Sequence, residues 1–188
     1  MKTALVAGVC LVLLAGCGGA EPATTPTATP TATPTEEPTT TRAGLPDDYR
    51  VPDIADPLEP GVFLANPCSL LSVSQRAEVG LPVAEQSPGV DTCVLGTERN
   101  PARPVELQIL EDSLVDLVDQ CRADDTCATW TPTTVEEHPA LLDTADACRL
   151  MVGLTDERTL VVNDLPESPC ERAVTIAELS MEELRTGP

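Results

Sequence analysis

Aromatic side chains are nearly absent from this sequence. One phenylalanine, one tyrosine and one tryptophan are the only rings of this kind in 188 residues. Sugar-binding grooves and single-strand nucleic-acid sites stack their ligands on aromatic rings, and three rings offer little surface for that. The scarcity of rings therefore argues against a carbohydrate-binding module and against a nucleic-acid stacking platform.

Basic residues are also scarce, with 11 lysines and arginines against 31 aspartates and glutamates, for a formal net charge of −20. Such a chain repels the phosphates of nucleic acids, so no nucleic-acid partner is expected. It also repels the anionic headgroups of a lipid surface. Any attachment to a membrane must therefore come from a covalent lipid.

Catalytic motifs are missing as well. The sequence has no G-x-S-x-G, no H-E-x-x-H, no P-loop and no G-x-G-x-x-G. Its single histidine, His138, stands between acids and Pro139, which predicts an exposed loop. Pairs of carboxylates are so numerous in this chain that they carry no information. We therefore predict no catalytic residue, no cofactor and no enzymatic activity.

The first 16 residues have the pattern of an export leader. Lys2 precedes an apolar run of about 11 residues. This run is too short for a transmembrane helix, which needs about 20 residues. The tetrapeptide Leu14-Ala15-Gly16-Cys17 resembles the bacterial lipobox. That resemblance implies cleavage before Cys17 and a diacylglycerol on its sulfur, and two acyl chains suffice for stable anchoring. The alternative is ordinary cleavage beside an unrelated cysteine.

A segment rich in threonine and proline follows the leader. Between Glu21 and Thr41, prolines recur every four residues and no apolar periodicity exists. Proline restricts the backbone to extended geometry, so this segment predicts a polyproline-II-like stalk. Residues 44–60 stay rich in proline and aspartate and are expected to be poorly ordered. The predicted organisation is a leader over 1–16, a lipidated cysteine and stalk over 17–60, and one domain over 61–188.

Six of the eight cysteines fall in the predicted domain, since Cys10 leaves with the leader and Cys17 takes lipid. An even number in an exported domain predicts three disulfides, although six cysteines allow 15 pairings. The shortest loop favours Cys121 with Cys127, and the remaining sequence neighbours are Cys68 with Cys93 and Cys148 with Cys170. A zinc site would need CxxC spacing, which is missing, so no metal is expected.

Hydrophobic periodicity predicts an order of helix, strands, helix, strands, helix. Ser72 and Gln75 form a capping box for the first helix, which Gly80 ends. Alternation follows at Val105–Ile109, and helical spacing at Leu114–Cys121. A hairpin is predicted around a four-residue TDER loop. This order favours an α+β class, an antiparallel sheet with packed helices in a small disulfide-stabilised single domain.

The last helix is predicted to begin at a capping box of Ser168 and Glu171, with Pro169 in its first turn. Acidic residues gather around the middle helix, and carboxylates can bind calcium. The spacing of a calcium loop and its glycine are missing, so a solvated helix face is the favoured interpretation. These acids are Asp112, Asp116, Asp119, Asp124 and Asp125.

Several short features, taken in order, resemble a known family. They are Asn66-Pro67-Cys68-Ser69-Leu70-Leu71 before a helix, Cys93 at a strand, Pro139-Ala140, Cys148 in a strand, and Cys170-x-x-Ala173 opening the last helix. The pattern resembles the actinobacterial lipoproteins grouped as domain of unknown function 3558, over about residues 66–184. The resemblance implies a lipobox, a Thr/Pro-rich stalk and one small disulfide-bearing domain, with no assigned activity.

Two positions depart from the pattern of that family. Leu95 stands where the family tends to have an aromatic residue, and Glu137 where it tends to have a glycine. The pair Cys121 and Cys127 looks like an addition to the shared bridges. These departures concern local packing and leave the order of the other features intact.

Three classes of function agree with these observations. We expect a lipid-anchored module on the extracytoplasmic face of the cell membrane, attached through Cys17, that binds an envelope protein or a small ligand. A sensor-like ectodomain and, third, an envelope hydrolase are the alternatives. A lined pocket would favour the first class and a partner-sized apolar patch the second. Buried carboxylates converging on His138 would favour the third.

Overall fold

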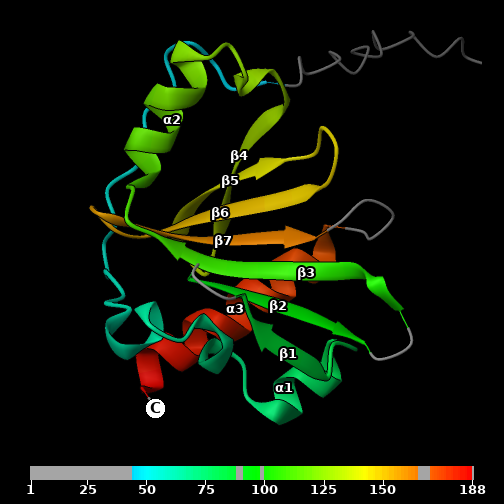
Figure 1. The fold of residues 1–188 in the computed structure, drawn as a ribbon. Helices are drawn as coiled ribbons and strands as arrows, with labels where there is room; N and C mark the ends of the chain where they lie inside the picture. Colours follow the sequence, from blue (N-terminus) through cyan, green and yellow to red (C-terminus); the bar gives the residue numbers. More distant parts are fainter. Residues whose placement is uncertain (1–43, 88–90, 98–99, 165–169, 188) are drawn as a thin grey trace, which may run out of the picture. The chain divides into compact units, whose positions relative to one another are not determined.

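The computed structural model describes residues 44–87, 91–97, 100–164 and 170–187. They form seven strands and three α-helices in the order α1, β1, β2, β3, α2, β4, β5, β6, β7, α3 (Figure 1). All neighbouring strands pair antiparallel. The predicted α+β class and the predicted order of helices and strands are confirmed.

The sheet has the spatial order β1-β2-β3-β7-β6-β5-β4, so β7 lies at its centre between β3 and β6. Sequence periodicity indicated β2, β3, β6 and β7, and it missed β1, β4 and β5. The strands are β1 Val83–Gln86, β2 Thr92–Thr97, β3 Asn100–Leu110, β4 Trp130–Val135, β5 His138–Asp143, β6 Cys148–Thr155 and β7 Arg158–Asp164.

The helices begin where side chains satisfy their free amide groups. In α1 (Val73–Glu78) the predicted capping box of Ser72 and Gln75 is present. Gly80 follows with a positive φ, which ends the helix as predicted. In α2 (Leu114–Ala123) Ser113 and Asp116 form a second capping box. The last helix, α3, runs from Glu171 to Thr186, with three short 3₁₀ helices elsewhere at Gly61–Leu64, Pro67–Leu70 and Cys127–Thr129.

One face of the sheet is covered by α3, which crosses behind the strands in Figure 1. Its apolar stripe packs on alternate residues of the strands, among them Leu107, Leu150 and Leu160, each of which is fully buried. Side chains from the stripe, such as Ile176 and Met181, complete this layer. Burial of leucine-sized side chains contributes about 1.5–3 kcal/mol each, so this face is the main source of stability.

The start of α3 is fastened to the sheet by an ion pair and a disulfide. Asp164 at the end of β7 is fully buried, and its carboxylate accepts a hydrogen bond of 2.8 Å from Nε of Arg172. That hydrogen bond, more than the charge itself, raises the pKa of Arg172. Cys148, the strand partner of Asp164, is bonded to Cys170 at the N-cap of α3. Removal of either fastening would release the first turn of the helix.

The three disulfides join the cysteines that are neighbours in sequence. They are Cys68–Cys93, Cys121–Cys127 and Cys148–Cys170, with Cα–Cα distances of 4.9, 5.2 and 5.3 Å. These distances are typical of disulfides. The pairing suggested by loop length is therefore confirmed.

Residues 44–60, called the strap below, lie against the domain. In Figure 1 this segment runs beside α2 and then down to the first 3₁₀ helix. Leu45, Tyr49 and Val51 pack on the apolar cluster under α2, and the amide of Leu58 donates to the carbonyl of Leu154 at 2.9 Å. Burial raises the pKa of Tyr49.

The expectation that the strap is poorly ordered was wrong, and the domain begins before residue 61. Apolar side chains spaced between its prolines and aspartates cover the edge of the core. A close approach to the sheet makes this possible, because a Cβ on Gly153 would lie only 3.2 Å from Cδ1 of Ile54. The glycine in β6 leaves room for the strap.

Two further details differ from the sequence prediction or lie beyond the described residues. The β6–β7 turn has two residues instead of four, since Thr155 pairs with Arg158. The predicted caps Ser168 and Pro169 lie outside the described residues, and the N-cap of α3 is Cys170 without a side-chain cap. No helix in the described part of the chain is long and apolar enough to cross a membrane.

Candidate functional site

A hollow of about 230 Å³ lies between the C-terminal end of α2 and the sheet. It is called the Arg149 pocket below. The chain packs its only tryptophan, a disulfide and a half-buried arginine around this hollow. The lining residues are Leu117, Gln120, Cys121, Asp124, Thr126, Trp130 and Arg149.

Strand register explains why these groups meet. Trp130 pairs with Asp143, Asp143 with Arg149, Arg149 with Asn163, and Asn163 with Glu106. Directly paired residues point to the same face of a sheet, so these five form one polar row across β4, β5, β6, β7 and β3. One step along the strands, the next row on this face is apolar and lies under α2, with Leu141, Met151 and Val161. The polar row thus lies beside the part of the face that α2 covers.

Arg149 has an unusual environment within this row. Its Nε is buried and has no hydrogen-bond partner among the described residues, and no ion pair is found there for its guanidinium. Five other arginines each bind a carbonyl or a carboxylate: Arg76, Arg122, Arg158, Arg172 and Arg185. A partly buried cation without a protein partner is unfavourable, which distinguishes Arg149 from these five arginines.

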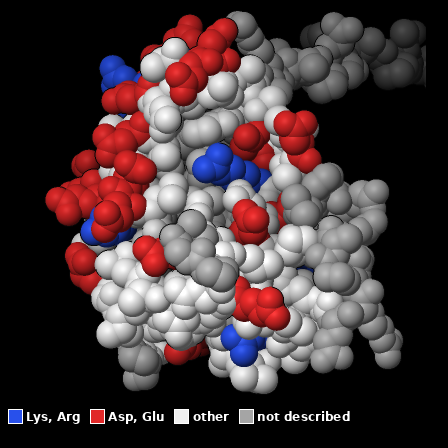
Figure 2. All heavy atoms as spheres, in the orientation of Figure 1, with Lys and Arg blue, Asp and Glu red and all other residues white. Residues whose placement is uncertain are grey.

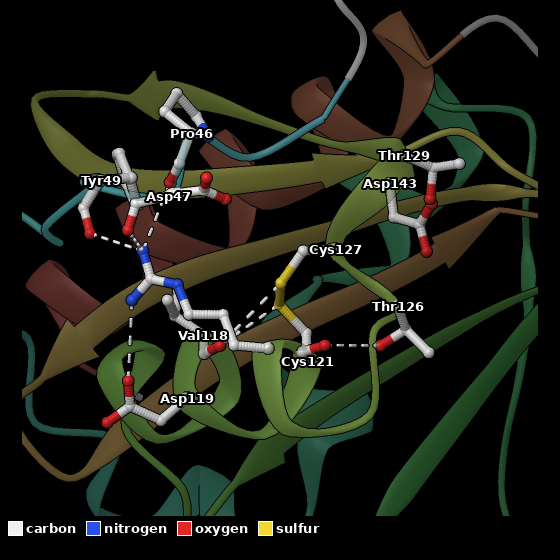
Figure 3. The surroundings of a disulfide bond; sticks show 11 residues. Pro46, Asp47, Tyr49, Val118, Asp119, Cys121, Thr126, Cys127, Thr129 and Asp143 are labelled. Atoms are coloured by element: carbon white, nitrogen blue, oxygen red, sulfur yellow. Dashed lines mark hydrogen bonds and ion pairs between the residues drawn. A yellow bond between two sulfur atoms is a disulfide. The ribbon is translucent and has the colours of Figure 1, made fainter.

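The side wall of the pocket is held rigid by the strap and a disulfide (Figure 3). Cys121 at the end of α2 is bonded to Cys127 in the following loop. Beside it, Nη2 of Arg122 donates to the carbonyl of Tyr49 at 2.8 Å and also reaches the carbonyls of Pro46 and Asp47. The helix end that lines the pocket is therefore tied on one side to the loop and on the other to the strap.

Larger hollows flank the strap, and in each of them a charged side chain already has a partner. One of about 490 Å³ is lined by residues of the strap and the β6–β7 turn. Its arginine, Arg158, pairs with Glu111 at 3.2 Å, and Thr155 Oγ1 accepts the amide of Glu157. Another of about 360 Å³ contains Asp116, whose carboxylate is occupied by Ser113. The Arg149 pocket is smaller and offers a charged group without a partner.

His138 is buried, which corrects the prediction of an exposed loop. It begins β5, is 4% exposed, and its Nδ1 lies 2.9 Å from the carbonyl oxygen of Gly153. It lines a hollow of about 90 Å³ with exposed acids from the strap and the β4–β5 turn, one of which, Glu136, pairs with Arg185. Pro139 follows His138 inside β5, although a proline in the sequence suggests the end of a strand. The carboxylates nearby are exposed rather than converging in a buried site.

Two of the five acidic residues around α2 have side-chain partners, and Asp112, Asp124 and Asp125 have none among the described residues. Asp116 accepts hydrogen bonds from the side chain and backbone of Ser113, which lower its pKa. Asp119 pairs with Arg122 at 3.8 Å, and Asp124 is the C-cap of the helix. Within the described ranges, no group of three or more histidine, cysteine or acidic side chains is placed to hold a metal ion.

Figure 2 shows how charge is distributed over this face. Acidic groups crowd along the side that carries α2, and a small group of basic atoms lies in the hollow beside the helix. The chain has a net charge of −20, and arginines also line two of the other hollows, Arg158 beside the strap and Arg185 near His138. Sequence reasoning missed Arg149 and Trp130 as site residues. The available signal was a charged residue within the otherwise apolar run Cys148 to Leu154.

The fold defines a small disulfide-bonded α+β domain. The chain matches the family described as "Protein of unknown function (DUF3558)" over residues 12–183, and it belongs to that family. No curated protein and no solved structure matched the chain. The sequence features that resembled this family thus led to the right one, and Cys68, Cys93, Cys148 and Cys170 form two of the three disulfides.

Proposed function

We propose that this protein is a lipid-anchored module of the cell envelope that binds a small ligand in the Arg149 pocket. The observation that carries the binding role is the half-buried guanidinium of Arg149, which has no partner among the described residues. A folded chain retains such a group at a cost, and a bound ligand of opposite charge removes that cost. Function, rather than folding, gives the best reason for an arginine at this position.

The proposed location follows from the leader and the lipobox. Residues 1–16 serve as the signal peptide, Cys17 carries the lipid, and the Thr/Pro-rich segment holds the domain away from the membrane on its extracytoplasmic face. Three disulfides in the domain agree with an oxidising compartment. The origin in an actinobacterial envelope is part of the same proposal.

Neither alternative class has an observation of similar weight. A sensor that acts through a partner would be favoured by a continuous apolar patch. The exposed large apolar side chains Val62, Val73 and Val115 come from three separate segments, on the first 3₁₀ helix, α1 and α2. A hydrolase centred on His138 would need buried carboxylates around it, and those beside His138 are exposed.

Anchoring is tested by the substitution Cys17→Ala. The variant is expected in the soluble fraction of the envelope, because no other anchor is proposed, whereas the wild type stays with the membranes. Incorporation of labelled palmitate should be lost in parallel. An unchanged membrane fraction would refute the lipid anchor.

Binding is tested by small molecules that the full chain retains through purification. We expect mass spectrometry of the denatured wild-type protein to release a compound that Arg149→Gln does not retain. Arg158→Gln is the matched control, because it makes the same change at an arginine in a different hollow. Identical profiles from wild type and Arg149→Gln would contradict a binding role for this pocket.

A further inference from the structure

We propose that the Arg149 pocket binds a small zwitterion of the α-amino-acid class, a ligand that carries one carboxylate and one ammonium group. This inference rests on the proposed function and names its ligand. The first element is Arg149 itself. A guanidinium presents parallel N–H donors that match the two oxygens of a carboxylate, and no acceptor in the described part of the chain bonds to the guanidinium of Arg149.

The wall contributed by α2 has the opposite preference. It consists of the last turn of α2, where Gln120 and Cys121 lie, and of its C-cap Asp124. The C-terminal end of a helix carries a partial negative charge, and Asp124 adds a full one. This wall attracts a cation such as an ammonium group. One hollow therefore has a cationic group on the sheet and an anionic wall on the helix.

Net charge separates a zwitterion from a simple anion. The chain carries a formal charge of −20, and Asp143 is the direct strand neighbour of Arg149 on one side. A ligand with only negative charge would be repelled by this field during its approach. A zwitterion has no net charge, and it places each of its groups against a wall of opposite sign. The acidic surface thus selects against plain carboxylates and phosphates.

The size and the apolar parts of the pocket set the scale of the ligand. A volume of about 230 Å³ lies below the roughly 300–1,000 Å³ typical of sites for drug-sized ligands. Leu117, Cys121 and Trp130, which is 7% exposed, also line the pocket and supply apolar surface. This arrangement suits a free amino acid with an aliphatic or aromatic side chain better than a long peptide.

The test uses the full chain purified in detergent and titrated with L-leucine and L-phenylalanine, with binding measured by calorimetry. Three probes are matched to leucine: N-acetyl-leucine lacks the ammonium, leucinamide lacks the carboxylate, and leucyl-leucine separates the two charges. We expect each modification to weaken binding about tenfold or more, because each removes or displaces one charged contact. Inorganic phosphate is expected not to compete.

The variants assign the contacts. Arg149→Gln should weaken the binding of leucine about tenfold or more and leave the weak binding of leucinamide unchanged. Asp124→Asn should weaken the binding of leucine by removing the charge that faces the ammonium group. Arg158→Gln should change nothing. Asp124 is exposed at a helix end, so its variant keeps the test valid if Arg149→Gln fails to fold.

The outcomes distinguish this inference from the proposed function. Equal affinity for N-acetyl-leucine, or Arg149-dependent binding of phosphate, would overturn the zwitterion and keep a ligand-binding pocket. Tighter binding of leucyl-leucine would assign the site to peptide ends and overturn the free amino acid. Absence of binding by every probe would overturn the zwitterion, and absence of any retained compound in the purified protein would overturn the binding role as well.

Discussion

The two faces of the sheet differ in what covers them. The α3 face is closed by a 16-residue helix whose first turn is fastened by a disulfide and by the Asp164–Arg172 ion pair. The α2 face is covered by a 10-residue helix and the strap, and the polar row with Arg149 lies beside the covered part. Both faces are built from the same strands. Because successive side chains point to opposite faces, neighbouring residues of one strand contribute to the apolar face and to the face with the polar row.

This difference places the tightest apolar packing on one face and the candidate site on the other. On the α3 face every exchange of a buried leucine for a smaller side chain costs about 2–5 kcal/mol, which leaves little freedom for chemistry. Charged groups lie beside the partial cover of the α2 face. That cover is held by the apolar cluster under α2 and by the contacts of Arg122 with carbonyls of the strap. The predictions below perturb one face at a time.

The largest effect is expected from removal of the strap. Deletion of residues 42–57 removes the apolar contacts of Leu45, Tyr49, Val51 and Ile54 and should lower the free energy of unfolding by about 5 kcal/mol. That corresponds to roughly 15 °C in melting temperature for a domain of this size. Thermal unfolding monitored by circular dichroism measures it.

The stalk provides the control for that deletion. Removal of Glu21–Thr41 should leave the melting temperature unchanged, because a proline-rich segment without apolar periodicity adds no burial. A drop of several degrees would show that the stalk packs on the domain. Equal melts for the two deletions would refute the role assigned to the strap.

The disulfides allow a direct comparison of the two faces. Cys148–Cys170 closes 22 residues on the α3 face, and Cys121–Cys127 closes six on the α2 face. Chain entropy alone predicts losses of about 3.4 and about 2.2 kcal/mol for the two paired Cys→Ser variants. The gap between the two variants in free energy of unfolding should exceed the gap between these values, because loss of Cys148–Cys170 also releases the start of α3 from the core. Equal melting temperatures would contradict that ranking.

The β4–β5 turn offers a stabilising change. Glu136 and Glu137 connect Val135 to His138 with φ angles of 47° and 72°, so both central residues of this two-residue turn are left-handed. Glu137→Gly, the residue that the family tends to have, should raise the free energy of unfolding by about 1 kcal/mol. Glu136→Gly should raise the free energy of unfolding by less, because it also removes the ion pair with Arg185. A lower melting temperature for Glu137→Gly would contradict this account of the turn.

The smallest effect is expected at the start of α2 and depends on pH. Hydrogen bonds from Ser113 lower the pKa of Asp116 in the folded protein. Their stabilisation is therefore present above the unfolded pKa of about 3.9 and is lost as the pH falls through the lower folded value. The melting temperature of wild type should exceed that of Asp116→Asn at pH 6, and the difference should vanish in acid. A difference that persists at pH 2 would show another cause.

Much of the fold could be predicted because its signals are local. The capping box at Ser72, the stop at Gly80 and the alternation in β3 each depend on a few neighbouring residues. The pairing of the cysteines followed from short loops for the same reason. Strands β4 and β5 were missed because their prolines and threonines resemble a loop, and only pairing with β6 and with each other makes them strands of the sheet.

The candidate site was the least predictable part. Arg149 and Trp130 are 19 residues apart, and they line one pocket because Asp143 pairs with both across the sheet. His138 was misplaced for a related reason, since the carbonyl that satisfies its ring comes from Gly153 on another strand. A partner supplied by a distant strand leaves no trace in the local sequence.

The sequence by itself determined the family, the α+β class and the order of helices and strands, because each depends on local spacing or composition. Short loops favoured the cysteine pairs, and the structure chose them among the 15 possible pairings. Tertiary structure alone decided that the strap belongs to the domain and that Arg149 lies in a pocket. Both depend on strand register and on the close approach of residues 44–60 to β6. Register is a cooperative property of the whole sheet, since a shift by one residue would move Arg149 to the opposite face.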